Sequence, residues 1–352
     1  MKRLKVISAL LIFLLICFGL FEGYSKLKEN HSKSTGKVLN IYNWGDYIDP
    51  SLISKFQEET GIKVNYNTYD TNETMYAKVK SGASNYDIVV PSDYMIEKMI
   101  KEGLLEKLDF NNIPNYKYIG DTFKHLSYDP KDEYSVPYMW GTIGIAYNSK
   151  YIKDPIDSWK DLWNPKYKNE IIMFDSVRDS MAIALKSLGY SMNSTNPEQI
   201  KQAGELLREQ KPLVLAYFVD EVKDALLSGE ATIAPVWSGD AAYMMSEDPD
   251  IKYIIPKEGT NEWFDALAIP KGAPHKKEAE EFINFLCNPE NALVNVEYIG
   301  YQTPIPETFT MLPESIKKEY PTKDELKNCE IYTDLNPKTL DLYDEEWIKL
   351  KS

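Results

Sequence analysis

Aromatic residues and aspartates recur together at the ends of the predicted strands, where side chains can meet a ligand. These groups occupy residues 44–47, 92–94, 175–179, 237–240 and 263–265, and Tyr301 follows in a later loop. A carboxylate attracts an ammonium group, and the face of an aromatic ring attracts both cations and methylene groups. A slot lined by rings and ended by carboxylates would therefore complement a methylene chain that carries ammonium groups. The pattern favours a site for a polyamine.

Each of these groups also has a purely structural interpretation. A Trp at the end of a strand often packs in a core or between domains, and an Asp after a strand often caps the next helix. Asp175 and Asp179 could also be the paired carboxylates of an exported hydrolase acting on glycosides. A helix cap plus a surface acid is the simpler interpretation of that pair. The sequence contains no GxSxG, GxGxxG, HExxH or Walker motif, which disfavours other common enzyme classes.

The charge composition narrows the choice of partners. The formal net charge is −14 at pH 7, which argues against nucleic acid as a partner because phosphate contacts need clustered basic residues. The arginines are Arg3, Arg178 and Arg208, so clamps for carboxylates or phosphates are scarce. The histidines and cysteines lack metal-ligand spacing. We expect no metal and no cofactor, and we expect Cys287 and Cys329 to be unpaired thiols.

Alternating strands and helices must position these groups. Apolar patterns predict strands at 39–43, 62–66, 87–90, 171–174, 233–236, 251–255 and 266–269. They predict helices at 50–60, 72–81, 94–102, 179–188, 197–209, 221–227, 275–287 and 339–349. This order predicts an α/β fold with mainly parallel sheets flanked by helices. Two such series predict two lobes, with a ligand cleft between them at the carboxyl ends of the strands.

The N-terminal segment, residues 1–25, is typical of a signal peptide or membrane anchor. A positively charged start precedes an uncharged apolar run at 6–21. Cys17 lies where bacterial lipoprotein signals carry the lipidated Cys, although Ile16 is larger than the small residue that normally precedes it. Lipidation, an uncleaved anchor and a cleaved signal stay open as alternatives. Residues 26–37 are polar and predict a flexible tether, so we expect an extracytoplasmic protein tethered to the cytoplasmic membrane.

Longer stretches resemble the bacterial spermidine/putrescine-binding proteins of ABC importers, in order and over nearly the whole folded chain. They are LNIYNWGDY at 39–47, FQEETGIKV at 56–64, NETMYAK at 72–78, YDIVVPS at 86–92, YSVPYMWG at 134–141, SWKDLW at 158–163, DALAIP at 265–270 and IGYQTP at 299–304. The resemblance implies a two-lobed type II periplasmic-binding-protein fold that a hinge closes on its ligand. It implies lobes formed by 37–140 plus 264–309 and by 141–263 plus 310–352.

The resemblance also implies the function and its partners. The protein would be a monomer that captures spermidine or putrescine, without catalysis, and delivers it to an ABC permease and its ATPase. A receptor for another small cationic solute is the first alternative, and the exported hydrolase is the second. The implied ligand contacts are Trp44, Tyr47, Ser92, Tyr94, Trp237, Trp263, Asp265 and Tyr301. Trp237, Trp263 and Tyr301 would enclose the methylene chain, and Asp265 would hold an amine. Tyr47, Ser92 and Tyr94 would help to hold the far end.

The sequence departs from the pattern of the well-known spermidine receptor in the slot itself. A Thr is replaced by Gly45, an acidic residue by Ser176, its Glu partner by Asp179 and a Gln by Tyr332. One acidic charge fewer leaves the choice between spermidine and putrescine open, and Asp46 or Asp93 could compensate. We therefore add Asp46, Asp179 and Tyr332 to the candidate ligand-binding residues.

Overall fold

The computed structural model describes residues 36–82 and 85–352. The predicted signal or anchor, Cys17 and most of the predicted tether lie outside these residues. Within the two described ranges, none of the helices combines the length and apolar character needed to cross a bilayer.

The strands of the described residues form one hydrogen-bonded path in the order β2-β1-β3-β9-β4-β7-β5-β6, with β8 beside β4. Pairing is parallel within β2-β1-β3 and within β7-β5-β6, and antiparallel wherever β4 or β9 takes part. The strands are β1 (Val38–Trp44), β2 (Lys63–Tyr69), β3 (Ile88–Val89), β4 (Ser135–Asn148), β5 (Ile171–Phe174), β6 (Val214–Phe218), β7 (Ile233–Trp237), β8 (Ile251–Ile254) and β9 (Glu262–Ala268).

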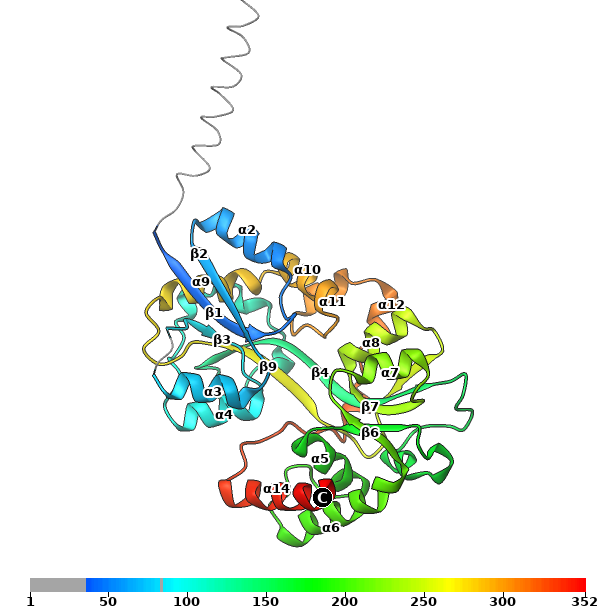
Figure 1. The fold of residues 1–352 in the computed structure, drawn as a ribbon. Helices are drawn as coiled ribbons and strands as arrows, with labels where there is room; N and C mark the ends of the chain where they lie inside the picture. The colour runs from blue at the N-terminus through cyan, green and yellow to red at the C-terminus, as the bar shows by residue number, and fades with distance from the viewer. Residues whose placement is uncertain (1–35, 83–84) are drawn as a thin grey trace, which may run out of the picture.

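The long strand β4 belongs to two lobes. Its first half, Ser135 to Thr142, pairs with β9, and its second half, Ile143 to Asn148, pairs with β7 and β8. Figure 1 shows β4 and β9 running side by side from the lobe that contains β1 to the lobe that contains β6 and β7. The fold is therefore two-lobed, as expected, although a shared strand joins the two sheets into one path.

Lobe 1, which carries the N-terminal strand, has helices on both faces of its sheet. Leu39 and Ile41 face the core under α2 and α9, whereas Tyr42 faces the core under α3 and α4. This alternation follows from the two-residue period of a strand. The helices of lobe 1 are α2 (Pro50–Thr60), α3 (Asn72–Lys80), α4 (Asp93–Lys101), α9 (Lys276–Leu286) and α10 (Pro289–Ile299).

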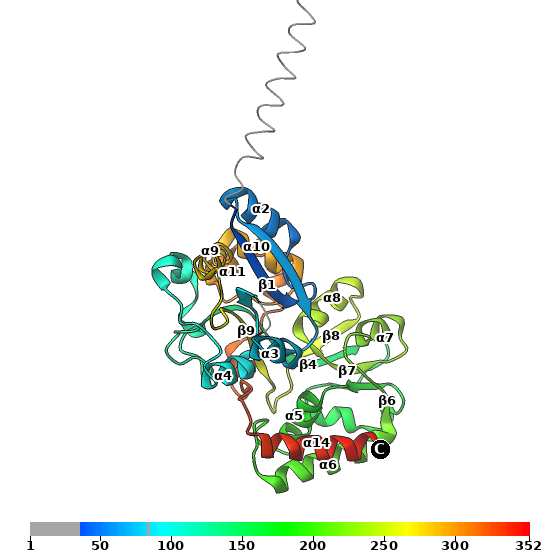
Figure 2. The ribbon, with the colours of Figure 1, turned by 60° about the vertical axis from the view of Figure 1, so that its left-hand side comes forward.

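Lobe 2 repeats this arrangement. Ile171 packs in the core with α5, α6 and α14, and the next residue, Ile172, packs in the core with α7 and α8. Figure 2 shows α14, the last helix, lying beside α5 and α6. The helices of lobe 2 are α5 (Val177–Ser187), α6 (Pro197–Gln210), α7 (Val222–Ser228), α8 (Ser238–Glu247) and α14 (Pro337–Lys351).

Local sequence signals set several helix ends. Asp49 caps α2 by accepting from the Ser51 amide, and Pro50 occupies the first helical position, where no amide donor is needed. The helix ends at Gly61, whose φ of 74° lies in the left-handed region that favours glycine. Ser176 caps α5 through the amide of Asp179, so the candidate site residue Asp179 lies in the first turn of a helix of lobe 2.

The predicted elements are present. The sequence patterns did not predict β4, β6, α8, α10 or the short helices α11 (Pro306–Met311), α12 (Glu314–Lys317) and α13 (Lys323–Leu326). The predicted strand at 266–269 is the end of a longer strand, β9, that begins at Glu262. In β4 nearly every residue is buried, so polar and apolar residues do not alternate along it. Pro137 and Gly141 within the strand further weaken the pattern.

Packing divides the C-terminal segment between the lobes. Leu312 packs in the core of lobe 1, whereas Leu335, Tyr343 and Leu350 pack in the core of lobe 2. The predicted ranges assigned all of 310–352 to lobe 2. We therefore propose that the last crossing between the lobes lies shortly before Leu335.

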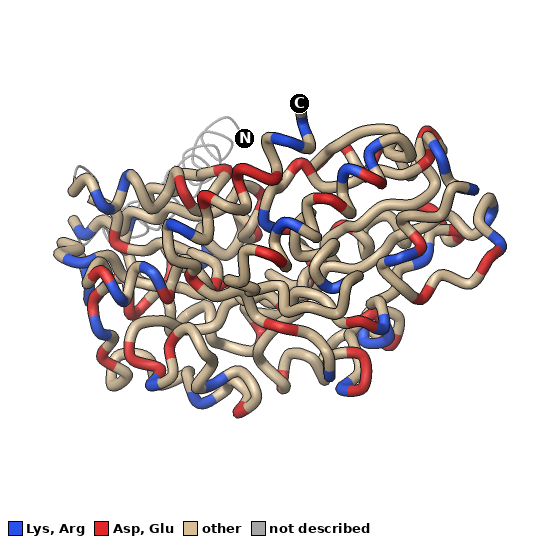
Figure 3. The backbone as a smooth tube through the Cα atoms, turned by 90° about the horizontal axis from the view of Figure 1, so that it is seen from below, with Lys and Arg blue, Asp and Glu red and all other residues tan. Residues whose placement is uncertain are grey.

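Charged residues of both signs are spread over the molecule. Figure 3 shows acidic and basic residues interspersed over both lobes.

Cys287 is buried, Cys329 is half-buried, and both are unpaired, as expected from the sequence. Burial raises the pKa of the Cys287 thiol to about 12, so this thiol stays protonated and unreactive at neutral pH.

Candidate ligand site at the junction of the lobes

The carboxyl group of Asp265 lies buried on the crossing strand β9. Its Oδ2 accepts a hydrogen bond of 2.7 Å from the Tyr47 hydroxyl, and its backbone forms an isolated bridge with Ser92. Its Oδ1 is buried and has no hydrogen-bond partner among the described residues. Burial raises the pKa of Asp265 to about 6, although the nearby hydroxyls of Ser92 and Tyr47 counteract part of that effect. The site thus contains a carboxylate oxygen that lacks a donor.

Aromatic rings surround this carboxylate. Trp263 and Tyr301 meet edge to face with 4.9 Å between ring centroids, and the rings of Tyr47 and Tyr301 are 5.9 Å apart. Gly141 and Gly239 allow this arrangement, because a Cβ on either glycine would overlap the Trp263 ring or the Tyr301 ring respectively. Gly239 belongs to α8 of lobe 2, so the Tyr301 ring reaches across the junction.

The loop after β1 places Tyr47 at the site. Asn43 accepts a hydrogen bond from the Trp44 amide, and the Tyr138 hydroxyl donates 2.6 Å to the Tyr47 carbonyl. Asn295 donates in turn to the Tyr138 hydroxyl. Asp46 takes a φ of 47°, which turns the chain so that its own side chain is exposed while Tyr47 points inward.

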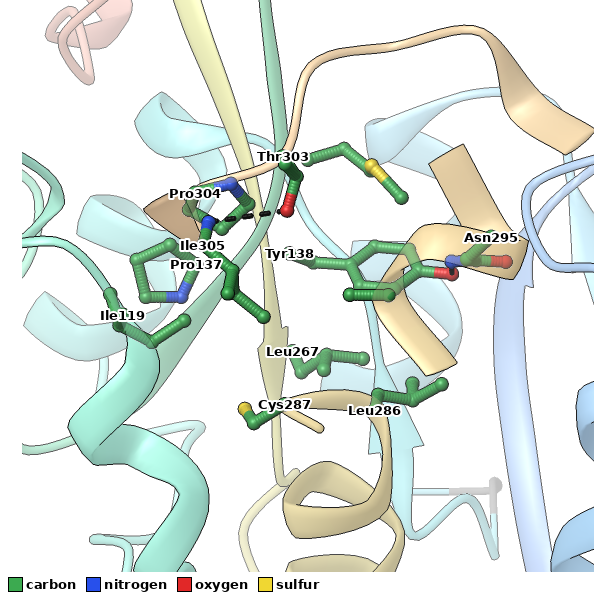
Figure 4. Close-up of a pocket in the computed structure, with 12 residues that line it drawn as sticks. Ile119, Pro137, Tyr138, Leu267, Leu286, Cys287, Asn295, Thr303, Pro304 and Ile305 are labelled. Atoms are coloured by element: carbon green, nitrogen blue, oxygen red, sulfur yellow. Dashed lines mark hydrogen bonds between the residues drawn. The ribbon is translucent and has the colours of Figure 1, made fainter. Parts of the chain in front are cut away.

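A small cavity lies behind Tyr138 in lobe 1 (Figure 4). Its volume of about 10 Å³ has room for about one water. The cavity is too small for a polyamine, so it does not compete with the Asp265 site as a binding place. Its lining includes Leu267, Asn295 and Thr303, which come from β9, α10 and the loop after α10.

The remaining lobe 1 candidates lie around the start of α4. The Trp44 indole donates to the Val90 carbonyl at 2.8 Å, which fixes the half-buried ring beside the strand end. The Ser92 hydroxyl accepts from the Asn72 amide at 3.1 Å. The Tyr94 hydroxyl accepts from that same amide and donates to Glu73. The start of α4 therefore contributes a hydroxyl and a ring that other side chains hold in place.

The candidate carboxylate of lobe 2, Asp179, has a different environment. Its Oδ1 accepts from the Tyr332 hydroxyl at 3.0 Å, and its Oδ2 accepts from the Ser176 hydroxyl at 2.7 Å. Burial raises the pKa of Asp179, while these two hydrogen bonds and the charge of Arg178 counteract that effect. The Arg178 guanidinium lies over the Tyr332 ring, 4.6 Å from its centroid. Both oxygens of Asp179 thus already have donors.

Trp237 ends β7 and lies between the cores of the two lobes, in contact with both. Its ring centroid is 4.6 Å from that of Phe174. The neighbouring acid Asp240 pairs with Lys223 at 3.0 Å. Trp237 therefore supplies lobe 2 with an aromatic ring near the junction.

Sequence reasoning missed several residues that shape the site. Arg178 lies inside a segment that was singled out only for its acids, and Tyr138 lies in the strand that was not predicted. Asn72 entered the sequence analysis only as the start of the predicted helix at 72–81, and its side chain connects Ser92 and Tyr94. Arg178 had one usable signal: it is a rare arginine directly before a candidate carboxylate.

The structure gives no support to a paired-carboxylate site at Asp175 and Asp179. Asp175 forms an ion pair of 2.9 Å with Lys351 and is largely exposed, whereas Asp179 is buried and bonded to Ser176 and Tyr332. In the two described ranges, no group of three or more His, Cys, Asp or Glu side chains could hold a metal ion.

Comparison with known proteins identifies the family of this chain. The family described as bacterial extracellular solute-binding protein matches residues 51–322. The chain belongs to this family. The earlier resemblance to spermidine/putrescine-binding proteins is confirmed by the Salmonella typhimurium spermidine/putrescine-binding periplasmic protein, which is 39% identical over 91% of this chain and 93% of its own length.

Solved structures show the same relationship between this solute-binding protein and its relatives. A putative spermidine/putrescine ABC transporter from Listeria monocytogenes is 46% identical, with a TM-score of 0.84 over 90% of this chain and 99% of the other. The Tp0655 (TpPotD) lipoprotein of Treponema pallidum is 30% identical, with a TM-score of 0.82 over 89% of this chain and 99% of the other.

Proposed function

We propose that this solute-binding protein captures a polyamine at the junction of its lobes and delivers it to an ABC permease with its ATPase. The buried Oδ1 of Asp265, which lacks a donor among the described residues, carries the proposal. An isolated buried carboxylate is costly, and an ammonium group from a ligand would supply both the missing donor and the missing charge. The relatives named for spermidine and putrescine support the same choice.

The rings explain why the ligand would be an aliphatic amine. Trp263 and Tyr301 offer apolar faces to methylene groups next to Asp265, and they also attract cations. A zwitterionic ligand would bring a carboxylate to a place where the nearest titrating group is itself acidic. The binding of another small cationic solute is the alternative that this geometry leaves open.

A ligand panel tests the proposal. Thermal shift and calorimetry with putrescine, spermidine, arginine and glutamate should show tight binding for the polyamines alone. Tight binding of arginine with no binding of either polyamine would favour the alternative. A parallel assay for hydrolysis of glycosides should show no product, because we propose that the protein has no catalytic role.

We also propose export and attachment to the cytoplasmic membrane, with the folded protein acting as a monomer. Support comes from the charged and then apolar N-terminal sequence and from a relative that is itself named a lipoprotein. Fractionation of cells should find the full chain with the membrane. Loss of membrane attachment in a Cys17→Ala variant would identify lipidation, and unchanged attachment would identify an uncleaved anchor.

A further inference from the structure

The two hydroxyls on Asp179 make this acid different from Asp265. Tyr332 and Ser176 each donate to one oxygen of Asp179, and the adjacent Arg178 places a positive charge beside it. Asp265 accepts a hydrogen bond from the Tyr47 hydroxyl at Oδ2, and its Oδ1 has no partner within the described ranges. Asp179 is thus satisfied by the protein, whereas Asp265 is not.

The structure holds Tyr332 firmly over Asp179. Arg178 donates to the Thr333 carbonyl at 3.2 Å and to Asn193 at 2.7 Å. Asn193 also accepts from the Thr333 amide and donates to the Ile331 carbonyl. Backbone bonds thus flank Tyr332 on both sides, and its side chain is 5% exposed. These bonds fix the backbone around Tyr332, and the burial of its ring leaves the hydroxyl little room to move away from Asp179.

The start of α4 lies between the two acids. Ser92 pairs with Asp265, and Tyr94, two residues further along, packs against a small cluster formed by Ala182, Met192 and Tyr332. A ligand chain that extends from Asp265 past the start of α4 would therefore meet the Tyr332 ring and the Arg178 guanidinium behind it. It would not meet an open carboxylate.

Building on the proposed function, we propose that Tyr332 determines the specificity of the site by donating its hydroxyl to Asp179 and so withholding this acid from the ligand. The site then selects a diamine such as putrescine over the triamine spermidine. A third ammonium group would have to lose water beside Arg178, whose charge repels it, without a free acid as partner. Specificity here comes from a cost imposed on the longer ligand.

Calorimetry with putrescine and spermidine tests this proposal on the wild-type protein and on Tyr332→Phe. The wild-type protein should bind putrescine at least about tenfold more tightly than spermidine. Tyr332→Phe keeps the ring and removes the donor, which frees one oxygen of Asp179. We expect the ratio of the two affinities to move toward spermidine by at least about tenfold.

Ser176→Ala provides a second variant in case Tyr332→Phe folds poorly, because it removes the other donor to Asp179. It should move the ratio in the same direction. Tyr190→Phe is the matched control: it removes a tyrosine hydroxyl that bonds to Gln202 beyond the far end of α5, and its ratio should equal that of the wild type. Thermal melting without ligand confirms that each variant is folded.

Two outcomes separate this proposal from the one on which it rests. If the wild type binds neither polyamine, the proposed function and this inference both fail. If the wild type binds polyamines but prefers spermidine, or if folded variants at positions 332 and 176 keep the wild-type ratio within threefold, the role of Tyr332 is wrong and polyamine capture stands.

Discussion

Two buried aspartates, one in each lobe, lie near the junction and differ in what satisfies them. Burial raises the pKa of both Asp265 and Asp179. Asp179 has a donor on each oxygen and Arg178 beside it, whereas Asp265 has a buried oxygen without a partner in the described ranges. The comparison teaches that burial alone does not identify a ligand-binding acid. The acid whose hydrogen bonds are incomplete is the one that we propose as the partner of a ligand.

The largest effect should follow from Asp265→Asn, which keeps the shape and removes the charge. Taking away one partner of a desolvated charge pair is strongly destabilising, because the other charge is stranded. We expect putrescine binding to weaken by at least about a hundredfold, or about 2.7 kcal/mol, in calorimetry. A variant that melts like the wild type and binds both polyamines within threefold would show that Asp265 only supports the strand.

Trp263→Ala should have the next largest effect. The substitution removes a ring face beside Asp265 and leaves the carboxylate in place. Loss of packing and of cation–π attraction should weaken polyamine binding by about 1–2 kcal/mol, measured by the same titration. The matched control is Trp347→Ala, which removes a Trp from α14 in lobe 2. A larger loss of affinity in the control than in Trp263→Ala would contradict the assignment.

The effect of pH on polyamine affinity should be about as large as the effect of Trp263→Ala. With the pKa of Asp265 at about 6 in the free protein, acid protonates the carboxylate and removes the partner of the ligand ammonium. Affinity should therefore fall about tenfold between pH 7 and pH 5. Burial also raises the pKa of Glu262 to about 7, so the contribution of Asp265 is the part of the pH dependence that Asp265→Asn abolishes.

The pH dependence of stability that Asp265 causes runs in the opposite direction from the pH dependence of binding. The folded pKa of Asp265 lies above its usual value of 3.8, so the folded state binds this proton more tightly than the unfolded state does. Without ligand, the contribution of Asp265 to the unfolding free energy should decrease as the pH rises from about 4 to about 6. Chemical denaturation of the wild type and of Asp265→Asn between these pH values measures this contribution as the difference between their unfolding free energies. If the unfolding free energies of the two proteins changed in parallel with pH, a buried, titrating Asp265 would be contradicted.

The smallest effect on affinity should come from Asp179→Asn. Its oxygens already accept from Tyr332 and Ser176, so the charge serves the protein more than the ligand. We expect putrescine affinity to change by about fivefold or less. A loss as large as that of Asp265→Asn would erase the difference between the two acids, and it would place Asp179 in direct contact with the ligand.

The sequence predicted the fold class and most of the lobe elements because their apolar patterns are regular. It could not predict β4, because a strand buried on both faces has no alternation and because Pro137 and Gly141 interrupt it. The helix α10 was missed although Asn288 and Pro289 give a clear start signal. The unpredicted elements thus include the strand that both lobes share and elements within each lobe, such as α10 in lobe 1 and α8 in lobe 2.

For the site, residue types near strand ends were sufficient to select Trp263, Asp265 and Tyr301, which the structure brings together. Sequence alone could not distinguish Asp265 from Asp179, because the difference depends on hydroxyls from distant segments. Tyr332 lies 153 positions from Asp179, and no local spacing predicts that contact. Asp46, by contrast, satisfied the sequence pattern and is exposed.

The shared strand β4 has a consequence for how this chain acquires its structure. Half of β4 completes the sheet of one lobe and half completes the other, and Leu312 and Leu335 return to different cores late in the chain. Neither lobe can therefore be cut out as a separate folding unit. Calorimetry should record a single cooperative melting transition for the whole protein, and refolding should be slow because sequence-distant strands must pair before either core closes.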